Sequence, residues 1–219
     1  MRHQRSRSPV FAISVVCLIT LVQACGCSRT DRSAHDPLIM RQRALELNTE
    51  AGDLLPGRPH EAMKRLKQAD TLAPGLSPVL NNMGICLLLE ERCFDAALMF
   101  RRSAAADPRN PEPLYNLGMV FEKTEDWETA ADYYEQALAL QPENVQNMEN
   151  LARVYVKLGR PRSEITPLAA KALKMEMRQE WVAWLSRYVD SQQDFVEDGG
   201  AVEGAPERSP ARSTQETMK

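Results

Sequence analysis

Cysteine and histidine are the side chains of this chain with the most chemistry to offer, as nucleophiles, acid–base groups and metal ligands. The sequence of 219 residues holds five cysteines and three histidines. His35 and His60 have no partner ligand at helical spacing, and no phosphate-binding glycine loop, G-x-S-x-G turn or cysteine–histidine pair occurs. The sequence therefore predicts no catalytic residue, no metal site and no cofactor, and we do not expect an enzyme.

Cys25 stands at the end of an amino-terminal segment in which charge and apolarity are separated. Three arginines precede an apolar run over residues 10–22, and small residues surround Cys25. A basic head, an apolar run and a small-residue exit are typical of a secretory signal. As a helix the run would span only about 20 Å, less than the roughly 30 Å hydrocarbon core of a bilayer. We therefore expect residues 1–24 to be a removable signal peptide rather than a permanent membrane span.

The sequence Val22-Gln23-Ala24-Cys25 resembles the lipobox of bacterial lipoproteins, in which an aliphatic residue, a variable residue and a small residue precede the acylated cysteine. The resemblance implies lipidation of Cys25, with residues 25–36 as a polar tether to the membrane. It also implies a place in the cell envelope. Gly26 rather than an aspartate follows the cysteine, which by analogy favours the outer membrane facing the periplasm. Ordinary cleavage and a retained signal anchor are the alternatives.

The charge of the chain limits its partners. It carries 27 basic and 30 acidic side chains, and loss of residues 1–24 takes three arginines and no acidic residue off a net charge of −3, leaving −6. A negative chain is repelled by nucleic acid and by anionic lipid headgroups. We therefore expect no nucleic-acid partner. Membrane attachment would rest on an acyl chain, each buried methylene of which contributes about 0.8 kcal/mol.

An internal period organises the middle of the chain. Gly84 recurs as Gly118, Ala96 as Ala130, Phe100 as Tyr134 and Pro108 as Pro142, and every pair differs by 34 in residue number. The same step separates Leu80, Leu114 and Met148, and also Asn82, Asn116 and Asn150. Self-similarity at this spacing is typical of stacked helix pairs, each of which buries its apolar face against its neighbours. The period therefore predicts a repeat protein.

Residues 111–144 resemble the tetratricopeptide repeat (TPR), a helix-turn-helix unit whose two helices are called A and B. The residues that carry the resemblance are Leu114, Leu117, Gly118, Phe121, Ala130, Tyr134, Ala137 and Pro142. Residues 77–110 match nearly as well. In residues 43–76 helix A fits only with a loop one residue shorter, and in residues 145–178 helix B departs from the pattern. The resemblance implies an all-α, right-handed superhelical solenoid of about four repeats within residues 37–190.

The chain after the repeats changes character twice. Trp181, Trp184, Leu185 and Tyr188 recur at helical spacing and predict an amphipathic helix over residues 175–192 that caps the last repeat, with an aromatic ligand box as the alternative. Residues 191–219 contain Phe195 as their only aromatic and predict a disordered tail. Cys86 and Cys93 fall on successive predicted helices, where a disulfide or two separate thiols are both open.

The resemblance also implies a binding groove along the A helices. The groove positions carried over to this chain are Asn81, Ile85, Leu88, Tyr115, Met119, Lys123, Glu149 and Arg153. The cations with which some family members bind a carboxyl terminus are missing here, so we expect a protein or peptide segment with apolar anchors. Ile85, Tyr115 and Met119 should form one exposed patch for it. The alternative is that the chain's own termini fill this surface.

These observations together predict a lipid-anchored protein-interaction module or scaffold in the bacterial cell envelope. A pilus or secretion assembly lipoprotein of the TPR type is the alternative within the same class. The helical shell of an envelope enzyme is an alternative from another class, and it lacks a catalytic constellation in this sequence.

Overall fold

The computed structural model describes residues 36–175 and 178–189, and every regular element in these ranges is an α-helix. The helices are α3 (Pro37–Leu54), α4 (Pro59–Leu72), α5 (Ser77–Leu89), α6 (Cys93–Ala106), α7 (Glu112–Lys123), α8 (Trp127–Leu140), α9 (Val145–Lys157), α10 (Arg162–Leu173) and α11 (Gln179–Val189). Within the described ranges, no helix combines the length and apolarity needed to cross a bilayer. The predicted signal peptide, Cys25 and the tail over residues 191–219 lie outside these ranges.

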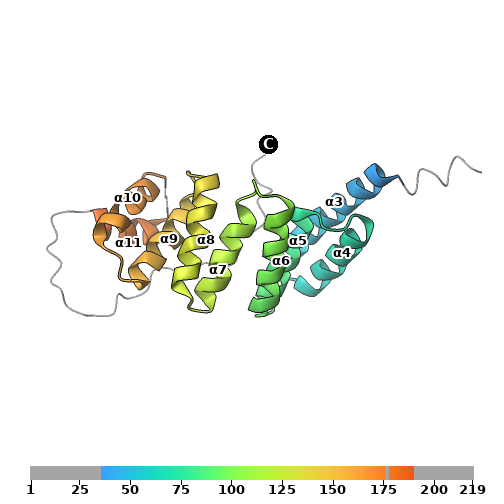
Figure 1. Ribbon diagram of the computed structural model, residues 1–219, viewed down its shortest axis with the longest axis horizontal. Coiled ribbons are helices and arrows are strands. Elements are labelled where there is room, and N and C mark those ends of the chain that lie inside the picture. Colours follow the sequence, from blue (N-terminus) through green and yellow to red (C-terminus); the bar gives the residue numbers. More distant parts are fainter. Residues whose placement is uncertain (1–35, 176–177, 190–219) are drawn as a thin grey trace, which may run out of the picture. The chain divides into compact units, whose positions relative to one another are not determined.

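The chain divides into two compact units, of which the second begins at Ala44, inside α3, and contains α4 to α11. Within this unit α4 packs on α5, and the B helices α6, α8 and α10 each pack on the helix before and on the helix after them, so that α4 to α11 follow one another in sequence order (Figure 1). This arrangement is an all-α superhelical repeat fold, as the sequence predicts.

Local signals at the helix ends explain where the pairs turn. Asp126 and Asn144 cap the first turns of α8 and α9 by accepting hydrogen bonds from backbone N–H groups. Helices α5, α7 and α9 are each followed by a residue of positive φ, namely Glu91, Glu125 and Gly159, which stand one period apart. A residue in the left-handed conformation after a helix closes its last turn and redirects the chain. The 34-residue period is therefore seen in the turns as well as in the core.

The crossing of helices A and B depends on a glycine against a ring. A Cβ atom on Gly118 would lie 2.5 Å from the ring of Tyr134, and one on Gly84 would lie 2.5 Å from the ring of Phe100. The three atoms nearest to a Cβ on Gly118 all belong to Tyr134, which is fully buried, so a glycine at this position permits the close approach of α7 and α8.

The cap is formed by α11 on the last helix pair. Trp181, Trp184 and Leu185 are buried in one cluster with residues of α9 and α10. The helix begins at Gln179, four residues later than the sequence predicts, and its predicted end at residue 192 lies outside the described ranges. The two tryptophans thus serve as core of the cap, the arrangement that the helical spacing favours.

Candidate protein-interaction surfaces

The A helices are joined by a ladder of buried side-chain hydrogen bonds. The amide nitrogens of Asn82, Asn116 and Asn150 donate to Asn48 Oδ1 at 3.0 Å, Asn81 Oδ1 at 2.9 Å and the Tyr115 hydroxyl at 3.0 Å. Each bond links one repeat to the repeat before it. Buried amides need such partners, so the asparagines that recur once in every repeat are explained by the register between neighbouring A helices.

The ladder continues into the cap through charged groups. The Glu149 carboxylate is fully buried, and both of its oxygens accept hydrogen bonds of 2.9 Å from the Arg178 guanidinium just before α11. The guanidinium carbons of Arg178 and Arg153 lie 5.7 and 5.8 Å from the centre of the Trp181 ring. Cations at this distance are attracted to the face of an indole, so charge and ring packing together fix the cap.

A second polar network fills the space between α7, α8 and α9. Glu122 accepts hydrogen bonds from the Tyr134 hydroxyl at 2.8 Å and from Arg153 Nε at 2.6 Å. Arg153 also donates to Asn150 Oδ1 at 3.2 Å. Burial raises the pKa of Tyr115 to about 12, and burial together with the Glu122 carboxylate raises the pKa of Tyr134 well above its ordinary value. Both phenols are therefore neutral hydrogen-bonding groups at neutral pH.

These contacts correct the predicted exposure of the A-helix groove. Ile85 and Tyr115 are only 4% and 8% exposed, and Met119 is half-buried, so the three do not form one open apolar patch. Leu88 is also buried, and Lys123 is exposed beside Glu91 with an N–O distance of 3.5 Å. The role of these residues in partner binding stays a prediction.

Hydrogen bonds within the fold explain why the predicted groove is not open to a partner. Three of its residues, Asn81, Tyr115 and Glu149, form a column along the A helices. Each accepts a hydrogen bond from a residue 29 to 35 positions later in the chain. The ladder and the cap thus occupy a column that the family resemblance assigns to a ligand. Partner atoms at this column would compete with bonds that the fold already makes.

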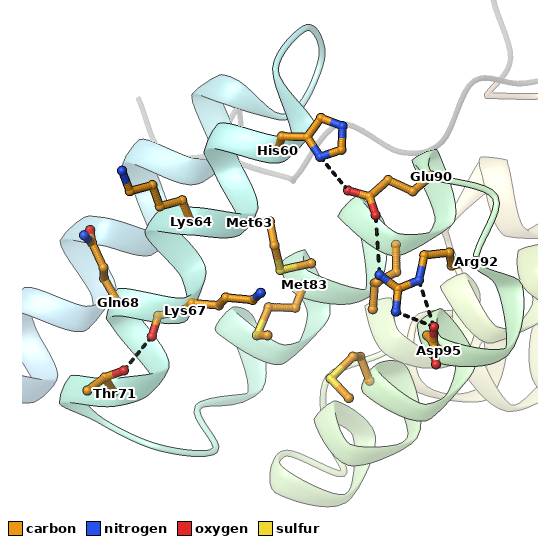
Figure 2. Close-up of a pocket in the computed structure, with 12 residues that line it drawn as sticks. His60, Met63, Lys64, Lys67, Gln68, Thr71, Met83, Glu90, Arg92 and Asp95 are labelled. Atoms are coloured by element: carbon orange, nitrogen blue, oxygen red, sulfur yellow. Dashed lines mark hydrogen bonds and ion pairs between the residues drawn. The ribbon is translucent and has the colours of Figure 1, made fainter.

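A groove of about 790 Å³ opens elsewhere, between α4 and α6 and above α5. Its apolar lining is formed by Met63, Met83, Leu87 and Met99. Met63 and Met83 are labelled in Figure 2. Methionine side chains adapt to irregular apolar ligands because they are unbranched and polarisable. Sequence reasoning missed this groove because it considered only the A-helix positions. The signal available in the sequence was the presence of three methionines, Met63, Met83 and Met99, on three successive predicted helices.

Charged residues border the groove on two sides. At one end, His60 Nδ1 lies 3.1 Å from Glu90, and Arg92 bonds to Asp95 at 2.6 Å (Figure 2). Along α4, the ammonium groups of Lys64 and Lys67 have no hydrogen-bonding or ion-pair partner among the described residues. The end of the groove is therefore neutralised internally, whereas its α4 wall presents two cations to a ligand.

The described residues hold no cluster of three or more histidine, cysteine, aspartate and glutamate side chains placed to bind a metal. Cys86 and Cys93 are separate thiols, Cys86 buried and Cys93 half-buried. Burial raises the pKa of the Cys86 thiol to about 12. Cys86 is therefore a packed apolar residue at neutral pH rather than a nucleophile.

Comparison with known proteins agrees with this geometry. Residues 111–144 match the family model of the tetratricopeptide repeat. No curated protein matches the sequence. Similar folds occur in a crystal structure of MamA (TM-score 0.54, 20% identity, 60% of this chain and 77% of that chain) and in pilF of Pseudomonas aeruginosa (0.59, 22%, 68% and 67%). A mutant O-GlcNAc transferase of Thermobaculum terrenum is also similar (0.58, 20%, 62% and 26%). These likenesses support a TPR protein and concern the fold.

Proposed function

We propose that this protein is a lipid-anchored scaffold of the bacterial cell envelope that binds a protein segment in the groove between α4 and α6. The TPR fold supports a protein-interaction role. The observation that carries the choice of surface is the groove itself, which combines an apolar floor with two cations, Lys64 and Lys67, whose ammonium groups have no partner among the described residues. The A-helix face is a poorer docking surface because its central column is bonded within the fold.

The lining of the groove defines the chemistry of the partner. Met63, Met83 and Met99 suit one large apolar side chain, and burying about 100 Å² of such a group contributes roughly 2.5 kcal/mol. Lys64 and Lys67 suit carboxylates close to that anchor in the partner's sequence. The preferred ligand is therefore an acidic segment with a single apolar anchor, and complementary charge would chiefly speed association and select the partner.

The groove is tested by reversing its charge. A Lys64→Glu, Lys67→Glu chain keeps its apolar core because both side chains are exposed. Arg109→Glu, Lys174→Glu is the matched control, with the same change of net charge at exposed positions outside the groove. Envelope proteins captured by wild type would be identified and purified, and their affinities measured for all three chains. We expect the groove variant to bind about tenfold more weakly and the control to bind as wild type does.

Equal affinity of the groove variant and wild type for every captured protein would contradict the groove as the docking site. Circular dichroism and the melting temperature must match among the three chains, so that a lost partner is not attributed to unfolding. A partner lost equally from the groove variant and the control would report only on net charge, and would also contradict the proposal.

Lipid anchoring through Cys25 is the second part of the proposal. It is supported by the lipobox resemblance of Val22-Gln23-Ala24-Cys25. Cys25→Ser should release the protein from the membrane fraction, and metabolic labelling with a fatty acid should mark wild type alone. Separation of inner and outer membranes tests the outer-membrane, periplasm-facing location. A wild-type protein that carries no lipid would contradict this part and leave the groove untouched.

Within the same class, a pilus or secretion assembly lipoprotein is the second candidate. It would share the predicted signal, the lipobox cysteine and the short TPR array, and pilF offers a similar fold. Deletion of the gene, followed by counting of surface pili and assay of secreted proteins, distinguishes it from a general scaffold. Normal pili and normal secretion would exclude this candidate.

A further inference from the structure

We propose that the groove between α4 and α6 accepts the acidic segment Asp194–Asp198 of a second copy of this chain. The inference rests on the groove of the proposed function and names one occupant for it. The segment reads Asp-Phe-Val-Glu-Asp and follows α11 closely in the sequence. Binding of this segment would link copies of the protein or compete with another partner for the same site.

The space between α6 and α8, one repeat later, shows which side chains fill the position that is open in the α4–α6 groove. The positions one period after Lys67, Leu87 and Met99 are Arg101, Phe121 and Tyr133. There the rings of Phe121 and Tyr133 stack at 5.5 Å, with the Arg101 guanidinium 5.7 Å from the Phe121 ring. Rings and cation thus occupy the equivalent space between α6 and α8.

The next equivalent position also carries a ring. Tyr155 stands one period after Phe121, and its hydroxyl donates to Glu135 at 2.8 Å. Of these three equivalent positions, only that of Leu87 in the α4–α6 groove lacks an aromatic residue. A ring supplied from outside would complete the groove as Phe121 and Tyr133 complete its neighbour.

The segment Asp194–Asp198 has the chemistry that such a site selects. Phe195 is the only aromatic residue after α11, and three carboxylates lie within three residues of it. Insertion of its ring among Met63, Met83 and Met99 would place acidic groups near the ammonium groups of Lys64 and Lys67, which pair with no residue in the described part of the chain. Aromatic rings contact methionine sulfur favourably, and the charges are complementary.

The length of the connection assigns the segment to another copy. Six residue steps lead from Val189, the last residue of α11, to Phe195, and six steps span at most about 22 Å. The groove belongs to the first two helix pairs, whereas α11 packs on the fourth (Figure 1). The A helices α7 and α9 stand between α5, which forms the floor of the groove, and α11. Packed helices lie about 8–10 Å apart, so the three spacings from α11 to α5 amount to about 24–30 Å and exceed this reach. A segment from a second copy has no such limit.

The first test uses a synthetic peptide of residues 190–202 and the full-length chain in mild detergent, labelled at its methionine methyl groups for NMR. Ring currents of Phe195 should shift the methyl signals of Met63, Met83 and Met99, while those of Met119 and Met148 stay in place. A Phe195→Ala peptide is the matched control and should bind about tenfold more weakly. The Lys64→Glu, Lys67→Glu chain should lose affinity for the wild-type peptide.

The second test measures self-association of the full-length chain by sedimentation velocity. We expect association that increases with concentration and is weakened by Phe195→Ala, with Val202→Ala as the control outside the segment. Groove methyl signals that do not move with the peptide would overturn the inference. Equal binding of the Phe195→Ala peptide, or a concentration-independent contact within one chain, would overturn it as well.

These outcomes separate the inference from the proposed function. If the peptide fails to bind while a captured partner still needs Lys64 and Lys67, the tail is not the occupant but the groove is a docking site. If both fail, the groove is not a docking site.

Discussion

Arg178 holds Glu149 at two points, donating hydrogen bonds of 2.9 Å to each oxygen of a carboxylate that is completely buried. Glu149 lies on α9, and Arg178 directly precedes the cap helix α11. A buried carboxylate is tolerated only when it is paired and hydrogen-bonded. The attachment of the cap therefore depends on this pair as well as on the tryptophans behind it.

Arg178→Ala should destabilise the protein by about 3 kcal/mol, because it leaves the Glu149 carboxylate buried without its main partner. Arg187→Ala removes an exposed guanidinium from α11 and is the control. Chemical denaturation followed by circular dichroism measures both. If the two variants lose equal stability, the pair does not hold the cap.

Gly118→Ala should cost about 1–3 kcal/mol, since the new Cβ would lie 2.5 Å from the fully buried ring of Tyr134. Gly57→Ala makes the same chemical change at a position with nothing within 4 Å of the new atom. Chemical denaturation of both variants measures their free energies of unfolding. A Gly118→Ala protein as stable as Gly57→Ala would contradict the assigned crossing of α7 and α8.

Tyr115 should make stability depend on pH in the alkaline range. Burial raises the pKa of Tyr115 from 10 to about 12 in the folded chain, so its contribution is fully present below pH 10 and is lost as pH rises through 12. The rise of the pKa from 10 to about 12 corresponds to a loss of about 3 kcal/mol. Tyr115→Phe should flatten the decline of unfolding free energy between pH 9 and 12, and an unchanged slope would contradict this expectation.

Cys86 should resist alkylation in the folded protein. Burial raises the pKa of its thiol to about 12, so little of the reactive thiolate exists at neutral pH. Cys93 is half-buried and serves as the internal reference. Peptide mass spectrometry after brief iodoacetamide treatment should find Cys93 modified first, and both modified after unfolding. Equal rates in the folded chain would show that Cys86 is accessible.

The fold could be predicted because its determinants repeat along the sequence. Gly84 lies against the ring of Phe100 and Gly118 against the ring of Tyr134, so the repeat period directly indicates the crossing of the α5–α6 pair and of the α7–α8 pair. Asn82 and Asn116 recur for an equally local reason, since each bonds to the repeat before it. A contact that recurs at the repeat length leaves a pattern that a single sequence reveals.

The candidate site could not be predicted in the same way, because it depends on departures from the period. Tyr115 occupies a position that the family resemblance assigns to a ligand, but its hydroxyl accepts a hydrogen bond from Asn150 of the next repeat. Glu149 likewise accepts hydrogen bonds from Arg178, which lies outside the repeat pattern. The groove arises where Leu87 and Met99 stand at positions that carry aromatic residues one period later. Only a packed structure shows that no other described side chain fills the space.

The packing of each helix on its immediate neighbours has a consequence for how the chain folds. Apart from the contact of α5 with α7, the helix contacts from α5 to α11 join elements that are adjacent in sequence, so closing them costs little loop entropy. Folding can nucleate at any helix pair and spread from it, and the outermost pairs, with a neighbour on one side only, unfold first. The groove lies in the first two pairs. A bound segment would therefore stabilise the amino-terminal pairs against local unfolding, and the unfolding transition of the whole array would become more cooperative.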